Sequence, residues 1–159
     1  MKLGKILPTA LLLASVSSAG LGGFAYAETV APDAVKFDEE SVSASLTGSA
    51  GSAETGRKVF VNRKQGNCLA CHANKDLSSQ PFHGEVGPPL DGVADRYDAA
   101  NLRGILVNSK VALHEDTIMP SFYRLKNGER TAKKFIGKTI LSAEQVEDVL
   151  AYLQTLKDE

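Results

Sequence analysis

Apolar side chains recur with a helical period near the C-terminal end of the chain. Ser142 and Gln145 have the spacing of a capping box, in which each side chain bonds the backbone N–H of the other residue. An apolar stripe follows at i, i+3, i+4, i+7 and i+10, formed by Val146, Val149, Leu150, Leu153 and Leu156. This pattern predicts an amphipathic helix that begins after Ser142.

Two earlier segments show shorter helical patterns. Residues 53–64 place three small or apolar residues on one face: Gly56, Val59 and Phe60. Residues 99–108 follow Asp98 as N-cap and direct three apolar residues inward: Leu102, Ile105 and Leu106. Strand-like alternation is scarce, and the connecting segments are rich in Gly and Pro, as in residues 81–92. The patterns predict a mainly α domain over residues 54–159, with long loops and a modest core unless a cofactor fills its centre.

The first 27 residues have the features of a secretory signal peptide. Lys2 and Lys5 supply a basic start, residues 6–16 are mostly apolar, and Ala25-Tyr26-Ala27 is a small-x-small cleavage site. The alternative is an uncleaved membrane anchor, which the Ser and Gly content before the cleavage site disfavours. We expect cleavage after Ala27 and export to the periplasm, with no membrane attachment afterwards.

The mature chain would begin with an arm of low complexity. Residues 28–53 are rich in Ser, Ala and Gly without an apolar period, so we expect an extended or flexible segment, which a partner could order. Loss of Lys2 and Lys5 leaves 16 basic and 19 acidic residues, a formal charge of −3. Such a balance does not favour nucleic acid or an anionic membrane as a partner.

The two cysteines belong to one short motif, Cys68-Leu69-Ala70-Cys71-His72. This C-x-x-C-H pattern is the attachment signature of c-type haem. Two thiols on one turn can each add to a vinyl group, and the next residue directs an imidazole at the iron. A structural disulfide would close only a tiny loop, a thioredoxin-type motif needs a preceding strand, and a zinc site needs further ligands. We therefore predict one covalent haem on Cys68 and Cys71, with His72 as an axial iron ligand.

The second axial ligand is sought among methionine and histidine, the usual partners in electron-transfer haems. Met119 is the only methionine left after signal cleavage, and it precedes Pro120, which stiffens its loop. The alternatives are His114, five residues away, and His83, in the Pro-rich loop. Met119 is the expected ligand, although methionine also commonly fills gaps in cores.

The segment Gly87-Pro88-Pro89-Leu90 follows the haem motif, and at this point the sequence resembles the class I cytochromes c. In that family the proline carbonyl accepts a hydrogen bond from the ligating imidazole, which implies a contact of Pro88 with His72. The family also packs a glycine and an aromatic residue of the first helix against an aromatic residue of the last. The residues that match this pattern are Gly56, Phe60 and Tyr152.

A narrower resemblance covers the chain from about residue 56 to residue 156. The ordered segments look like those of the SoxX family, the X subunits of the SoxAX sulfur-oxidation cytochromes. These segments are residues 66–72, 84–93, 96–97, 102–108, 117–123 and 137–141. No departure occurs at the matched ligand positions.

The SoxX resemblance implies an electron-transfer subunit of an enzyme. In that family the X subunit pairs with a SoxA-type cytochrome. The heterodimer, an L-cysteine S-thiosulfotransferase, joins thiosulfate oxidatively to a cysteine of the SoxYZ carrier. The SoxA haem performs the bond formation, and the SoxX haem passes electrons to a soluble cytochrome. This chain has no third cysteine, which agrees with a relay role. The alternatives are an independent soluble electron carrier and a haem sensor, which would need an open sixth position.

Two polar features complete the sequence picture. Arg96 and Tyr97 would contact the haem propionates by the same resemblance, or else form a surface salt bridge and a packed ring. A basic run between residues 124 and 138 contains one acid, Glu129, and would steer an anionic partner or thiosulfate unless it is a solvated face. Its members are Arg124, Lys126, Arg130, Lys133, Lys134 and Lys138.

Overall fold

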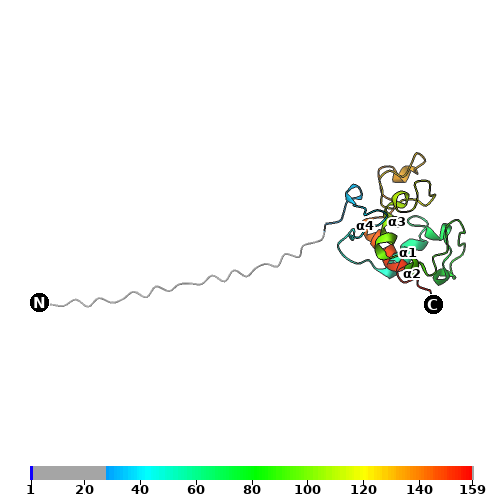
Figure 1. Ribbon diagram of the computed structural model, residues 1–159, viewed down its shortest axis with the longest axis horizontal. Helices are drawn as coiled ribbons and strands as arrows, with labels where there is room; N and C mark the ends of the chain where they lie inside the picture. The colour runs from blue at the N-terminus through cyan, green and yellow to red at the C-terminus, as the bar shows by residue number, and fades with distance from the viewer. Residues whose placement is uncertain (2–27, 159) are drawn as a thin grey trace.

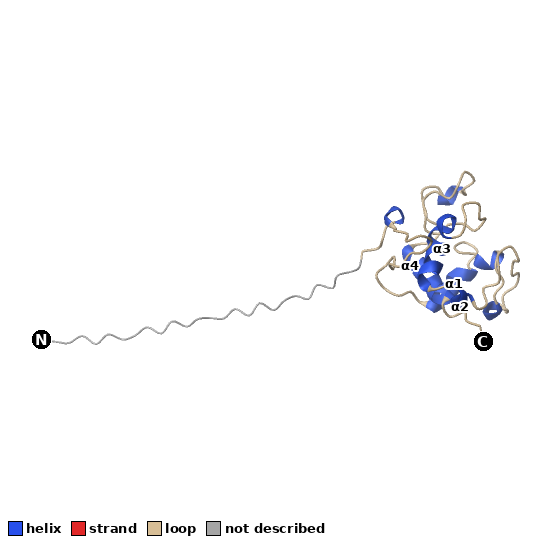
Figure 2. Cartoon of the chain, in the orientation of Figure 1, coloured by secondary structure: helices blue, strands red, loops and turns tan. Residues whose placement is uncertain are grey.

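The computed structural model describes Met1 and residues 28–158, so the expected signal peptide lies outside the described residues apart from Met1. Loops join helices throughout, and Figure 2 draws no strand in the described part of the chain. Among those residues no helix has both the length and the apolar character needed to cross a membrane. The helices are η1 (Pro32–Ala34), α1 (Ala53–Val61), η2 (Cys68–Ala70), η3 (Lys75–Leu77), α2 (Val93–Arg96), α3 (Ala99–Ala112), η4 (Lys133–Phe135) and α4 (Ala143–Leu153). The prediction of a mainly α fold is confirmed.

Helices α1 and α4 pack against each other in the domain (Figure 1). Their backbones approach closely at Gly56, where an added Cβ would lie 1.9 Å from the backbone oxygen of Asp148. Phe60 and Tyr152 meet edge to face beside this contact, with 5.4 Å between their ring centroids. Aromatic pairs favour this geometry. The expected packing of Gly56, Phe60 and Tyr152 is therefore confirmed, and it requires a residue without a side chain at position 56.

The helix starts agree with the sequence patterns better than the helix ends do. Ser142 and Gln145 form the capping box, and the Asp98 side chain caps α3 by accepting from Asn101 N. Helix α1 ends at Val61 rather than at residue 64, because Asn62 has extended backbone. Helix α3 continues to Ala112, past a break in helical geometry at Asn108 where the pattern predicted its end.

The N-terminal arm lies along α3 and α4 of its own chain. Its backbone is largely irregular and extended, and Val42 and Leu46 are each only 1% exposed. Val42 N donates to Ala100 O at 3.0 Å, at the start of α3. The arm is therefore held by hydrogen bonds and apolar contacts within its own chain. Two separated apolar residues produce no period, so the sequence pattern does not reveal this packing.

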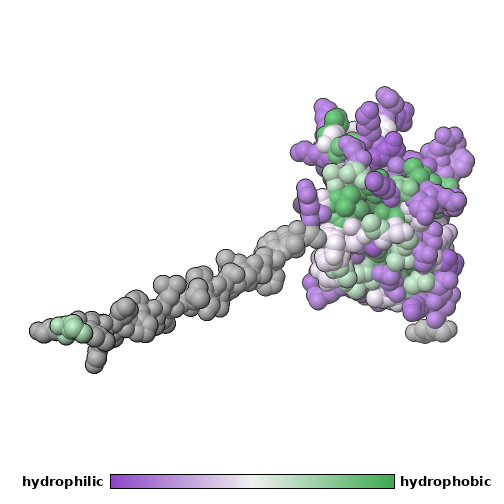
Figure 3. Space-filling model, turned by 60° about the vertical axis from the view of Figure 1, so that its left-hand side comes forward, coloured by the Kyte–Doolittle hydropathy of each residue, from purple (hydrophilic) through white to green (hydrophobic). Residues whose placement is uncertain are grey.

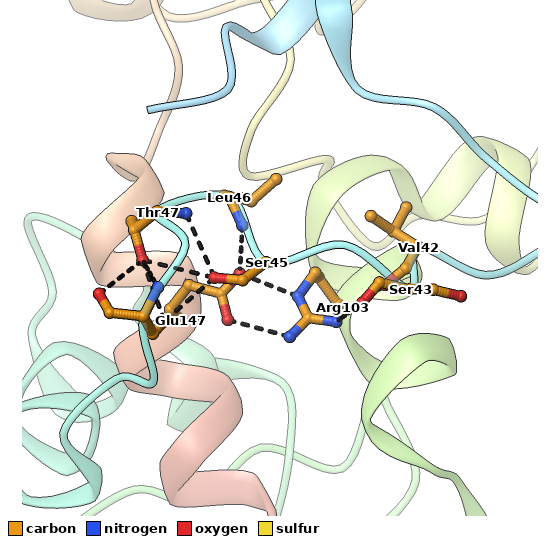
Figure 4. A network of polar contacts seen from close by, with 8 residues as sticks. Val42, Ser43, Ser45, Leu46, Thr47, Arg103 and Glu147 are labelled. Atoms are coloured by element: carbon orange, nitrogen blue, oxygen red, sulfur yellow. Dashed lines mark hydrogen bonds and ion pairs between the residues drawn. The ribbon is translucent and has the colours of Figure 1, made fainter. Parts of the chain in front are cut away.

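A buried ion pair fastens the arm to both helices (Figure 4). Arg103 of α3 donates from Nε to Glu147 Oε1 at 2.8 Å and from Nη2 to Oε2 at 3.1 Å. The side chains are 10% and 3% exposed, respectively. Leu46 N donates to Glu147 Oε1, and Arg103 Nη1 donates to Val42 O, both at 2.8 Å. The backbone of the arm thus completes the hydrogen bonding of a pair that would otherwise be costly to bury.

Glu147→Gln should lower the free energy of unfolding by about 3–5 kcal/mol, because Arg103 would stay buried without its counter-charge. Urea denaturation of the haem-containing protein would measure the change. Lys58→Ala is the matched control, since it breaks the exposed pair of Lys58 with Glu54 and should hardly change the stability. Equal small effects of the two substitutions would contradict the prediction.

Candidate functional site

A cavity of about 500 Å³ lies among α1, α3, α4 and the loops that join them. Its wall is mostly apolar, with Phe60 from α1, Leu102 and Leu106 from α3, and Val149 and Leu153 from α4. The volume falls in the range of ligand pockets, about 300–1,000 Å³. Every site residue predicted from the sequence lines this cavity: Cys68, Cys71, His72, Pro88, Arg96, Tyr97 and Met119.

The C-x-x-C-H motif forms a tight turn on the cavity wall. Asn67 adopts left-handed backbone (φ 51°, ψ 37°) and leads into η2. Both Cys71 N and His72 N donate to Cys68 O at 3.0 Å, which closes the turn. Both cysteines are free thiols in the structure. One turn therefore presents two sulfur atoms and an imidazole to the same apolar space.

The thiol of Cys68 is unsuited to disulfide exchange. Burial raises the pKa of this thiol to about 12. Thiol–disulfide oxidoreductases depend instead on a thiol pKa lowered to about 3.5–7.5, because the thiolate is the nucleophile. The thioredoxin-type alternative is disfavoured on this ground.

The imidazole of His72 is held by the segment that follows the motif. His72 Nδ1 lies 2.8 Å from the carbonyl oxygen of Pro88. A carbonyl can only accept, so Nδ1 carries the proton and Nε2 keeps its lone pair for a metal. The contact between Pro88 and His72 implied by the sequence is present.

Backbone hydrogen bonds and a glycine fix the position of that segment. Gly87 N donates to Cys71 O at 2.8 Å, and Leu90 N donates to Ala73 O at 3.0 Å. A Cβ on Gly87 would lie 2.3 Å from the Cε1 atom of His72. The ring occupies this place only because residue 87 has no side chain.

Of the three candidates for a second ligand, Met119 alone lines the cavity. It is half-buried and packs against the core. The side chain of His114 is 71% exposed and lies near Asp116 instead. His83 is half-buried, and its nitrogens contact Asn74 N at 3.2 Å and Leu77 O at 3.0 Å. Neither histidine shares the cavity with His72.

Arg96 and Tyr97 lie at the exposed edge of the cavity. Arg96 donates to the carbonyl oxygens of Asp91 and Pro89, at 2.7 and 3.0 Å. It therefore braces the loop rather than forming the surface salt bridge considered from the sequence. Tyr97 is 42% exposed. Other exposed apolar residues also border the cavity, namely Val86, Leu113 and Ile118, and Figure 3 shows apolar side chains gathered on an exposed face of the domain.

A polar network behind the motif was not found by sequence reasoning. Asn74 is 1% exposed and donates from Nδ2 to Tyr152 Oη at 2.9 Å. The Tyr152 hydroxyl donates to Asp76 Oδ2 at 2.7 Å, and Arg57 Nε donates to the same oxygen at 2.9 Å. The Tyr152 hydroxyl and the Arg57 guanidinium hold the pKa of Asp76 below its usual value, whereas burial raises the pKa of Tyr152. The network connects α1 and α4 to the chain just after His72.

The basic run is a solvent-facing segment. Its six lysine and arginine residues are exposed, and none forms an ion pair with another described residue. Lys134 lies over the ring of Phe135, with 4.5 Å from Nζ to the centroid. Hydrogen bonds of Ile140 N and Leu141 N to Phe122 O, at 2.9 and 3.0 Å, close the base of the loop.

Comparisons with known proteins agree with this arrangement. A family model described as cytochrome c matches residues 53–157. A chain in the crystal structure of SoxXA from P. pantotrophus is 42% identical, with a TM-score of 0.75, over 82% of this chain and 99% of that chain. The c-type cytochrome SorU from Sinorhizobium meliloti is 26% identical over 66% of this chain and 90% of that chain, with a TM-score of 0.43. Comparison with curated proteins found no match.

Proposed function

The chain belongs to the cytochrome c family, in its SoxX branch, and binds a c-type haem covalently; from this we propose that it is the electron-transfer subunit of a SoxAX heterodimer. The main support for the proposal is that the predicted haem-binding residues line one cavity of about 500 Å³. Both cysteines, His72 and Met119 line it, although Met119 is remote from the motif in sequence.

In this proposal Cys68 and Cys71 would hold the haem through thioethers, and His72 and Met119 would bind its iron. The donor set fits the group, because two thiols, an imidazole and a thioether border an apolar cavity of suitable size. Pro88 fixes the tautomer and orientation of His72 through Nδ1. Arg96 and Tyr97, at the exposed edge, are the donors proposed for the propionates.

The haem supplies one-electron transfer, and the protein residues hold it and exclude water from it. With both cysteines in thioether bonds, the chain has no thiol left to accept sulfur. With His72 and Met119 both binding the iron, the site would leave no open ligand position for substrate. These two features support a relay of electrons rather than the bond-forming step.

The partners and location belong to the same proposal. The similarity to a chain of SoxXA supports a SoxA-type cytochrome as the stable partner. The heterodimer would act as an L-cysteine S-thiosulfotransferase on the SoxYZ carrier, and a soluble cytochrome would accept the electrons. The N-terminal sequence supports a periplasmic location after signal cleavage.

Reconstitution tests the function. Purified, haem-containing residues 28–159 should exchange electrons with a redox mediator but should not conjugate thiosulfate to a SoxYZ carrier. Addition of a SoxA-type subunit should produce conjugation, measured as the mass increase of the carrier. Conjugation by this chain alone, at the rate of the reconstituted pair, would overturn the relay model. Failure to bind any SoxA-type subunit would favour an independent carrier.

A further inference from the structure

Helix α3 is interrupted at Asn108, next to the backbone groups that bind the segment carrying Met119. Asn108 departs from helical geometry, with φ −148° and ψ 86°. The carbonyl oxygens of Leu106 and Val107, on the turn before the break, accept from Phe122 N at 2.9 Å and Tyr123 N at 3.3 Å. Insertion of another group into the helical ladder is a recognised cause of such kinks. The break in α3 therefore lies where the segment that carries Met119 forms hydrogen bonds with the helix.

Side chains at the break hold the same segment from within the core. Ser109 is fully buried, and its hydroxyl donates to the backbone oxygen of Met119 at 2.7 Å. Ser121, 1% exposed, donates to Asn108 Oδ1 at 3.0 Å and lies 3.3 Å from the Ser109 hydroxyl. Ser109 is thus the residue of this pair that contacts Met119 directly.

A methionine ligand needs such support. Its side chain has three rotatable bonds, so the backbone position limits where the sulfur can lie. The carbonyl oxygen of Met119 has a strong partner in a buried hydroxyl, and loss of that partner would leave a polar group unsatisfied near the core. The loop would then relax toward solvent and carry the sulfur with it.

We propose that Ser109 is a positioning residue for Met119, holding its backbone so that the sulfur stays on the haem iron. The inference rests on the proposed function, in which Met119 is an axial ligand. Ser109 does not touch the haem site itself, since it is absent from the cavity wall.

Imidazole, a small ligand that competes for the sixth position of the oxidised haem, provides the test. Ser109→Ala in the haem-containing protein should raise the apparent affinity for imidazole about tenfold, equivalent to about 1.4 kcal/mol, and weaken the red absorption band of the iron–thioether bond. Ser109→Thr keeps the hydroxyl and should restore wild-type affinity. Ser121→Ala removes an equally buried hydroxyl that bonds Asn108 rather than Met119, so it should raise the affinity for imidazole much less than Ser109→Ala does.

The outcomes separate positioning from a general structural role. Unchanged imidazole affinity in Ser109→Ala, or an equal rise in Ser121→Ala, would overturn the proposal. A tenfold rise in Ser121→Ala would overturn the proposal even if Ser109→Ala yields too little holoprotein to measure. Met119→Ala, measured alongside, tests the assumption that Met119 binds the iron. If this variant binds imidazole as the wild type does, the ligand assignment is wrong, and the result does not concern the role of Ser109.

Discussion

Replacement of both Cys68 and Cys71 by alanine should abolish covalent haem, and either single replacement should leave at most one thioether and greatly reduced holoprotein. The reason is geometric: one tight turn places both sulfur atoms on the wall of the same cavity. No other cysteine exists in the chain to take their place.

The measurement is retention of haem after denaturation. Acid–acetone extraction should leave the haem on the wild-type chain, whose mass should exceed that of the apo chain by one haem. Ala70→Ser is a matched control, because this exposed residue lies between the cysteines on the same turn and should leave attachment intact. Haem that washes out of the unmodified protein would disprove covalent attachment through this pair.

Met119→Ala should abolish the weak red absorption band of the oxidised protein, because that band reports an iron–thioether bond. Met119 lines the cavity with His72 and is the only methionine beyond the expected signal peptide. The substitution should also open the sixth position, so the reduced protein should bind carbon monoxide, which the wild type should exclude.

His114→Ala is the control for the ligand assignment. His114 is close to Met119 in sequence, but its side chain is exposed and does not border the cavity. Its replacement should leave the red band and the low-spin spectrum unchanged. The assignment of Met119 would be wrong if His114→Ala removed the low-spin character and Met119→Ala did not.

Local patterns in the sequence predicted much of the fold. The capping box at Ser142 and the cap at Asp98 depend on residues within one helical turn, so their spacing is sufficient to identify them. The C-x-x-C-H motif is equally local, since all its members share one turn. Pro88 and the pairing of Phe60 with Tyr152 were reached through resemblance to a family rather than through spacing, and the structure has both contacts.

Interactions between distant segments were not predictable in this way. Nothing in the sequence indicates that Arg103 and Glu147, on different helices, form a buried pair, or that the backbone of the arm completes it. The sequence pattern of α3 ended at Asn108, although the helix continues to Ala112. A helical period cannot show that a later loop bonds the helix beside a kink, after which the helix continues. Helix α2 is a single turn, too short to produce a period.

The sequence by itself therefore determined the helix starts, the haem attachment turn and the identity of the candidate ligands. Each of these follows from side-chain chemistry within a few neighbouring residues. Only the tertiary structure decided that Met119 rather than His114 shares a cavity with His72, that the arm packs on its own chain, and that Ser109 holds the Met119 loop. The physical reason is that burial and hydrogen bonding between remote segments depend on how the helices cross, and this crossing is set by the packing of the whole domain rather than by any local pattern.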